Sequence, residues 1–156
     1  MDWSVVTNNL DVLLEGALLT LKISAYSLIL SIPIGIVAGL CRVSNIKILS
    51  WPATWYIEFI RGVPLLVLLL WIYFALGKFF NLGSYLSAIL GLAIFSGAFV
   101  AEVVRAGIEA VPRGQMEAAR SSGMTYIQAM RLVILPQALR MVLPPMASQF
   151  IILIKD

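Results

Sequence analysis

Few side chains in this sequence could carry covalent chemistry. Its 156 residues contain no histidine and a single cysteine, Cys41. Structural zinc sites are built mainly from cysteine and histidine, and a disulfide within one chain needs two cysteines. The sequence therefore excludes a Cys/His metal site and an intrachain disulfide. We expect no catalytic residue and no bound metal in this chain, which has few groups for enzyme chemistry.

The side chains that stand out are charged residues within otherwise apolar stretches. Glu58 and Arg61 are three positions apart, and so are Glu102 and Arg105. On a helix this spacing puts both members of a pair on one face. One interpretation is a polar gate or exit path for a zwitterionic substrate. The other is that these residues reach the headgroups, pair across helices and anchor the neighbouring loop.

Uncharged polar residues are scarce in the middle of the apolar stretches. Ser96 lies in one of them, and Gln149 follows Ser148 in another. Such residues either hydrogen-bond a substrate or bridge neighbouring helices. We keep Ser96 and Gln149, together with the two charged pairs, as candidates for a substrate pathway.

The elements that position these residues must be membrane helices. Hydrophobic residues make up 61% of the chain and charged residues 12%, against roughly 45–50% and about 25% in soluble domains. The excess must face lipid, and disorder is excluded because it needs low hydrophobicity. A spanning helix needs about 20 apolar residues. We predict an all-α membrane protein with one transmembrane domain over residues 1–156. Its four predicted spans cover about residues 16–41, 53–76, 84–106 and 137–154.

The first predicted span carries a Gly-x-x-x-Gly pattern at Gly35 and Gly39, which permits close approach by another helix. A signal peptide is the alternative for this segment. Signal peptides begin with basic residues, whereas this N-terminus is acidic, and the apolar run is too long. We therefore expect a retained spanning helix.

Lysine and arginine residues indicate the orientation, because short cytoplasmic loops carry an excess of them. Residues 1–15 contain none, and the second connection contains only Lys78. The first connection has Arg42 and Lys47, and the third is rich in arginine. We expect the N-terminus outside and the connections 42–52 and 107–136 in the cytoplasm. The net charge of +3 then reflects topology and is no evidence for nucleic acid binding.

The long connection 107–136 contains the signals of two short helices. Pro112 suits a helix start, and Gly123 suits a left-handed C-terminal cap. Thr125 and Gln128 have the spacing of a capping box that starts a second helix, which Pro136 would end. Two short helices in this connection would either dock to a soluble partner or lie as amphipathic helices on the lipid headgroups.

Here the sequence resembles a known family. Glu117-Ala118-Ala119, three residues, Gly123, nine residues and Val133-Ile134-Leu135-Pro136 are similar to the EAA motif of bacterial ABC importer permeases, with valine in an isoleucine position. Three further stretches resemble the branch of that family for polar amino acids. They are Glu58 to Leu66, Ser96 to Arg105 and Leu135 to Arg140.

The resemblance implies a membrane-spanning subunit of an ATP-driven amino acid importer in the bacterial inner membrane. Its partners would be a second permease copy, two cytoplasmic ATP-binding subunits and an external solute-binding protein. Glu117, Ala118, Ala119 and Gly123 would belong to a coupling helix that sits in a groove of the ATPase. No Gly-x-x-x-x-Gly-Lys-Ser/Thr sequence occurs here. We therefore expect ATP and magnesium to bind the partner subunit, with no cofactor in this chain.

Two alternatives remain at this point. One is a truncated permease that acts as a scaffold without transporting, and the other is an ATP-independent channel or carrier. A carrier would show inverted repeats between its halves, which we do not find in the sequence. The resemblance also implies a fifth spanning helix after the fourth, so we expect the chain to be truncated at its C-terminus.

Overall fold

The computed structural model describes residues 9–155, and all elements among them are helical. Residues 1–8, and with them the expected position of the N-terminus, lie outside the described part. In chain order, the elements are α2 (Leu10–Arg42), α3 (Lys47–Gly62), α4 (Leu65–Trp71), the π-helix η1 (Ile72–Gly77), α5 (Gly83–Glu109), α6 (Arg113–Ser121), α7 (Tyr126–Ala129), the π-helix η2 (Met130–Ile134) and α8 (Leu135–Lys155).

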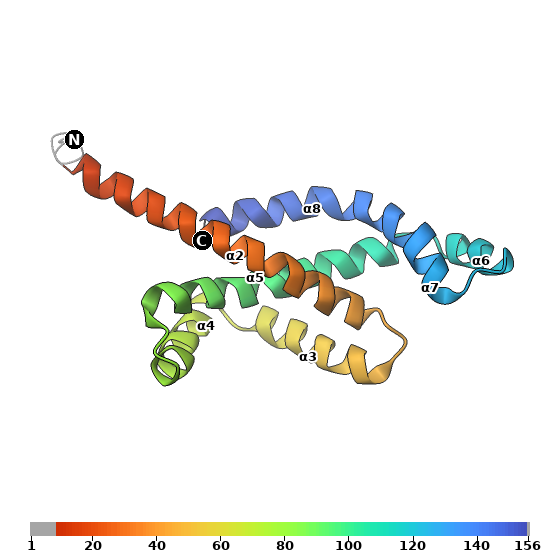
Figure 1. Ribbon diagram of the computed structural model, residues 1–156, viewed down its shortest axis with the longest axis horizontal. Helices are drawn as coiled ribbons and strands as arrows, with labels where there is room; N and C mark the ends of the chain where they lie inside the picture. Colours follow the sequence, from red (N-terminus) through yellow and green to blue (C-terminus); the bar gives the residue numbers. More distant parts are fainter. Residues whose placement is uncertain (1–8, 156) are drawn as a thin grey trace.

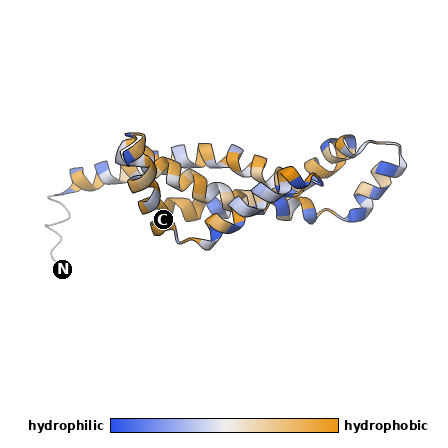
Figure 2. Ribbon diagram, turned by 90° about the horizontal axis from the view of Figure 1, so that it is seen from below, coloured by the Kyte–Doolittle hydropathy of each residue, from blue (hydrophilic) through white to orange (hydrophobic). Residues whose placement is uncertain are grey.

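The long helices lie along one axis of an elongated molecule. Figure 1 shows α2, α5 and α8 running lengthwise, with α3 beside them and α6 and α7 at one end. The start of α2 projects at the opposite end. Figure 2 shows that hydrophilic residues gather at the end formed by α6 and α7, whereas the helical body is mostly hydrophobic. The polar connection and the apolar bundle are therefore separated along the long axis.

Three helices of the described residues are long and apolar enough to cross a membrane. They are Leu10–Arg42, Gly83–Glu109 and the continuous helical run Tyr126–Lys155. Each is longer than the corresponding predicted span. The structure therefore confirms the helical membrane architecture. The helices also continue beyond the apolar stretches from which they were predicted.

The second predicted span, 53–76, is not one straight helix. The chain bends by 109° between α3 and the following helical run Leu65–Gly77. Pro64 has no backbone N–H and disfavours the α conformation in the residue before it, and Val63 is indeed extended, with φ −96° and ψ 132°. The pair forms either a broken span or a re-entrant loop. Apolar composition alone does not reveal this break, because the apolar run continues through it.

The closest helix packing joins α2 to α5. One side of α2 presents only small buried residues: Ser24, Ser27, Ser31, Gly35 and Gly39. A Cβ atom added at Gly39 would lie 2.7 Å from the carbonyl oxygen of Ala101, which is too close for any real contact. The Gly-x-x-x-Gly pattern therefore does let the two backbones approach. The serines extend this stripe, and the Ser27 hydroxyl donates a hydrogen bond of 3.2 Å to the carbonyl of Ile89.

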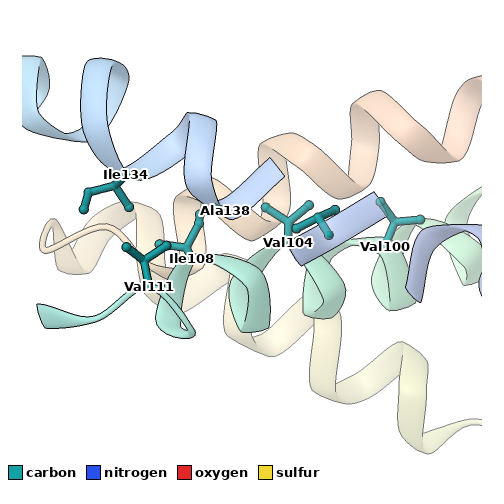
Figure 3. Packing of buried hydrophobic residues seen from close by; sticks show 7 residues of the cluster. Val100, Val104, Ile108, Val111, Ile134 and Ala138 are labelled. Carbon is teal, nitrogen blue, oxygen red and sulfur yellow. The ribbon is translucent and has the colours of Figure 1, made fainter. Parts of the chain in front are cut away.

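A second hydrophobic core lies between α5 and α8. Figure 3 shows Val100, Val104, Ile108 and Val111 facing Ile134 and Ala138. The partly buried Met116 of α6 packs against the same cluster. The apolar core therefore continues from the spanning helices into the connection between them.

Pro136 does not end the helix that starts at Thr125, so that prediction was wrong. The helix continues from Tyr126 to Lys155. A proline ring inside an α-helix clashes with the carbonyl four residues earlier. Here the turn before Pro136 is a π-helix, in which the N–H of Leu135 donates to the carbonyl of Met130. We infer that the wider turn gives the ring room, so the short helix and the spanning helix are one element.

Candidate functional site

Six charged side chains converge where α2, α3 and α5 meet. Arg42 is the last residue of α2, and its guanidinium binds two carboxylates from two other helices. Nη2 of Arg42 lies 3.1 Å from Oε1 of Glu58 in α3, and Nη1 lies 3.0 Å from Oε2 of Glu102 in α5. One arginine therefore ties three helices together.

Glu102 is the centre of this cluster. Its carboxylate also binds Arg105, whose Nε lies 3.1 Å from both oxygens, and Arg61, whose Nη1 lies 3.5 Å away. Arg105 pairs in addition with Glu109 one turn later. The Glu102 side chain is 20% exposed. Three arginines thus share one half-buried carboxylate.

The two expected i,i+3 pairs behave differently. Glu102 and Arg105 bind each other as their spacing predicts. Glu58 instead binds Arg42, while Arg61 reaches Glu102 and places its guanidinium carbon 5.4 Å from the centre of the Phe99 ring. All four candidates therefore belong to one cluster. Its ion pairs cross between helices, as one of the two interpretations requires, and a role as a gate stays a prediction.

Sequence reasoning missed the partner that joins the cluster, Arg42. In the sequence, Arg42 stands out only as one of the basic residues that indicate topology. The residues from Ile23 to Cys41 carry no charge, and Arg42 ends that run, so the predicted spans place Arg42 at the same membrane depth as the other charged candidates. That shared depth was the signal that could have identified it.

Ser96 and Gln149 come together in a different part of the bundle. Both line one small cavity of about 90 Å³ between α5 and α8. The remaining lining residues are apolar: Phe95, Phe99, Ile152 and Leu153. Phe99 lies between this cavity and the charged cluster, because it also contacts Arg61. The cavity and the charged cluster, which together contain all six pathway candidates, thus lie next to each other along α5.

The coupling candidates lie in α6 and in the turn to α7, and these two helices form the hairpin at one end of the molecule (Figure 1). Gly123 turns the chain with φ +84°, a left-handed conformation that favours glycine. Thr125 then caps α7, and its hydroxyl and the Gln128 side chain form both hydrogen bonds of a capping box. The predicted glycine corner and capping box are confirmed.

The residues of α6 divide into an outer and an inner side. Glu117 and Ala118 are exposed, whereas Ala119 is 6% exposed and buried within the chain. The side chain of Gln137 in α8 donates to that of Gln115 in α6 across 3.2 Å. Ala119 therefore packs α6 against its own chain, and Glu117 and Ala118 are the coupling candidates within α6 that a partner could reach.

Comparison with known proteins places the chain in one family. The family described as "Binding-protein-dependent transport system inner membrane component" matches residues 31–156. A protein of Bacillus subtilis named as a probable glutamine ABC transporter permease protein, GlnM, is 41% identical over 157 residues, covering 100% of this chain and 73% of that protein. The glutamate/aspartate import permease protein GltK of Escherichia coli O157:H7 is 36% identical, covering 99% of this chain and 73% of that protein.

Two solved structures have the same fold. A crystal structure of an amino acid ABC transporter with histidines matches with a TM-score of 0.91 and 42% identity, over 99% of this chain and 73% of that one. A methionine ABC transporter in an inward-facing conformation matches with a TM-score of 0.75 and 24% identity, over 95% of this chain and 72% of that one, which shows the fold alone.

The helical membrane architecture, the EAA-type hairpin and these matches agree. The chain therefore belongs to the family of binding-protein-dependent transport system inner membrane components, the permease subunits of ABC importers.

Proposed function

We propose that this chain is the permease subunit of an ATP-driven importer of a polar amino acid, and that α6 is its coupling helix. The observation that carries the proposal is how the hairpin is connected to the spanning helices. The hairpin is joined at one end to α5 and at the other runs without interruption into α8. A force on α6 is therefore transmitted to two spanning helices.

The exposed side of α6 fits a docking role. Glu117 offers a negative charge to a cation of the ATPase, and the methyl group of Ala118 allows close approach. The packing of Met116 and Ala119 on the inner side keeps the hairpin together while it is pushed. Closure of two ATP-binding subunits around ATP and magnesium would then tilt α5 and α8 and switch access across the membrane.

The orientation follows from this role. ATP-binding subunits are cytoplasmic, so the end formed by α6 and α7 lies in the cytoplasm and the start of α2 lies outside. The excess of arginine around the hairpin supports this orientation. A solute-binding protein would deliver the amino acid at the opposite end, and a second permease copy would complete the pathway.

The substrate class rests on relatives and on the polar candidates. Relatives are named for glutamine and for glutamate/aspartate. We assign Ser96 and Gln149 to the pathway because they line a common cavity, where a hydroxyl and an amide can hydrogen-bond a zwitterion. The charged cluster between this cavity and the hairpin is the proposed gate.

The test is to express the chain with its ATP-binding subunits, purify it through a tag on the permease, and screen amino acids in liposomes containing the solute-binding protein. We expect the ATP-binding subunits to co-purify and one polar amino acid to stimulate ATP hydrolysis. Uptake by the purified chain without any ATP-binding subunit would establish a carrier instead. If the ATP-binding subunits co-purify but no amino acid stimulates ATP hydrolysis or is taken up, the chain is a scaffold.

A further inference from the structure

An apolar groove of about 550 Å³ lies on the surface where α2, α5 and α8 meet. Ile36 of α2 and Leu139 of α8 form parts of its walls, and both side chains are partly exposed, at 41% and 58%. Of the described residues that line the groove, Arg131 is charged and all others are apolar. The groove therefore has one polar end and an apolar body.

The length of the groove corresponds to half a bilayer. The charge-free part of α2 lies between Lys22 and Arg42, which are 20 positions and so about 30 Å apart along the helix, the thickness of the hydrocarbon core. On α2 the groove begins at Ile32, halfway between these two charges, and continues to Leu40. The groove thus runs from the middle of the membrane to one surface, through one leaflet.

Arg131 lies at the headgroup end of that leaflet. A Cβ atom added at Gly107 would lie 3.3 Å from the carbonyl of Ala138, so Ala138 is level with the last turn of α5. Arg131 lies seven positions earlier on the same continuous helix, in η2, on the side of the hairpin. Its guanidinium therefore belongs to the polar region beyond the hydrocarbon core.

The charge of Arg131 is uncompensated within the described part of the chain, where it forms no ion pair. The surrounding segment 113–140 contains four arginines and one glutamate. A guanidinium binds phosphate strongly, and basic pockets between membrane helices at the cytoplasmic side bind anionic headgroups. The ligand that combines a phosphate at one end with an apolar chain one leaflet long is a phospholipid.

We propose that this groove binds an anionic phospholipid of the cytoplasmic leaflet, with its phosphate on Arg131 and an acyl chain between α2 and α8. The choice of leaflet rests on the orientation given under the proposed function. A spanning helix, either of a second copy or the fifth helix expected after α8, fits less well, because such a helix continues through both leaflets whereas the groove stops at Ile32. The lipid would lie against α8, the helix that continues into the coupling hairpin.

The test measures the phospholipid that remains bound to the intact permease–ATPase complex. The complex is reconstituted in nanodiscs of phosphatidylethanolamine with a minor fraction of phosphatidylglycerol, extracted into mild detergent, and analysed by native mass spectrometry. We expect wild-type protein to retain phosphatidylglycerol and Arg131→Gln to retain about fivefold less, the factor that one basic residue near an anionic surface supplies. Arg131→Lys should retain most of it.

Matched controls separate the groove from general surface charge. Arg140 is exposed on the same helix and does not line the groove, so Arg140→Gln should retain wild-type amounts. Ile36→Trp fills the groove and should release the lipid, whereas Ile29→Trp, also exposed on α2, should not. Equal retention in Arg131→Gln and wild type, or equal loss in Arg140→Gln, would overturn the proposal.

The lipid proposal would also be overturned if a protein segment occupied the groove. With Cys41→Ser as background, a Leu139→Cys variant that cross-links to a second permease copy would show that a protein segment occupies the groove. The amino acid–stimulated ATP hydrolysis of the same preparations distinguishes the two proposals. If the amino acid still stimulates ATP hydrolysis but Arg131→Gln retains as much phosphatidylglycerol as wild type, the proposed lipid site is wrong and the proposed transport function stands.

Discussion

Nη1 of Arg42 lies 3.0 Å from Oε2 of Glu102, which joins the last residue of α2 to the second half of α5. The same guanidinium binds Glu58 of α3 through its other terminal nitrogen. The two acidic residues differ in their surroundings, because the Glu102 side chain is 20% exposed and that of Glu58 is 65% exposed.

Glu102→Gln should destabilise the protein more than Glu58→Gln. Loss of the Glu102 carboxylate leaves three arginines close together without their shared anion. We expect a cost of about 1–3 kcal/mol, above that of an exposed pair and below that of a fully buried one. Glu58→Gln should cost less than ~1 kcal/mol. The measurement is the thermal unfolding midpoint in detergent, and an equal loss in both variants would contradict the central role of Glu102.

Gly39→Ala should loosen the contact between α2 and α5. The new methyl group would lie 2.7 Å from the backbone oxygen of Ala101, which can move only if the helices separate. We expect a loss of about 1–3 kcal/mol. Gly16→Ala on the same helix has open space around it and should gain about 0.5–1 kcal/mol from helix propensity. The thermal midpoints of the two variants should move in opposite directions. A shared direction would mean that the contact does not limit stability.

Gly123→Ala should weaken the corner of the hairpin without affecting the spanning helices. Alanine in the left-handed conformation that Gly123 adopts costs about 1–2 kcal/mol. Gly114→Ala in α6 is the control, because that glycine is helical and has open space around it. Hydrogen exchange of the amides in 113–129 should become faster in Gly123→Ala and not in Gly114→Ala. Unchanged exchange in the first variant would show that the corner can adopt another conformation.

Gln149→Leu should weaken uptake of the amino acid. An amide lost from the cavity shared with Ser96 removes a hydrogen bond of about 0.5–1.5 kcal/mol, so the half-saturation concentration should rise about two- to tenfold. Ser148→Ala is the control, since Ser148 is exposed and does not line that cavity. If both variants keep the wild-type half-saturation concentration, Gln149 only bridges helices.

Local signals in the sequence predicted the parts of this fold that depend on local chemistry. Gly123 and the Thr125–Gln128 box specify the hairpin through backbone conformation and hydrogen bonds between near neighbours. Gly35 and Gly39 indicate close packing because their spacing places both on one helix face. These features need no knowledge of distant residues.

The parts that sequence reasoning missed depend on distant residues or on competing local effects. The partnership of Arg42 with Glu102 joins residues 60 positions apart, so no spacing rule reveals it. The two prolines have opposite outcomes: Pro64 breaks its helix, whereas Pro136 is accommodated by the π-helix before it. The core between α5 and α8 packs against the second helix on both sides of Pro136, through Ile134 and Ala138.

The most direct test of the account is an Ala118→Trp substitution on the exposed side of α6. Its matched control is Asn45→Trp, an exposed position in the connection after α2, on the same side of the membrane under the proposed orientation. We expect Ala118→Trp to lose the co-purifying ATP-binding subunits and the amino acid–stimulated ATP hydrolysis, and Asn45→Trp to keep both. Wild-type co-purification and stimulation in Ala118→Trp would contradict the assignment of α6 as the coupling helix.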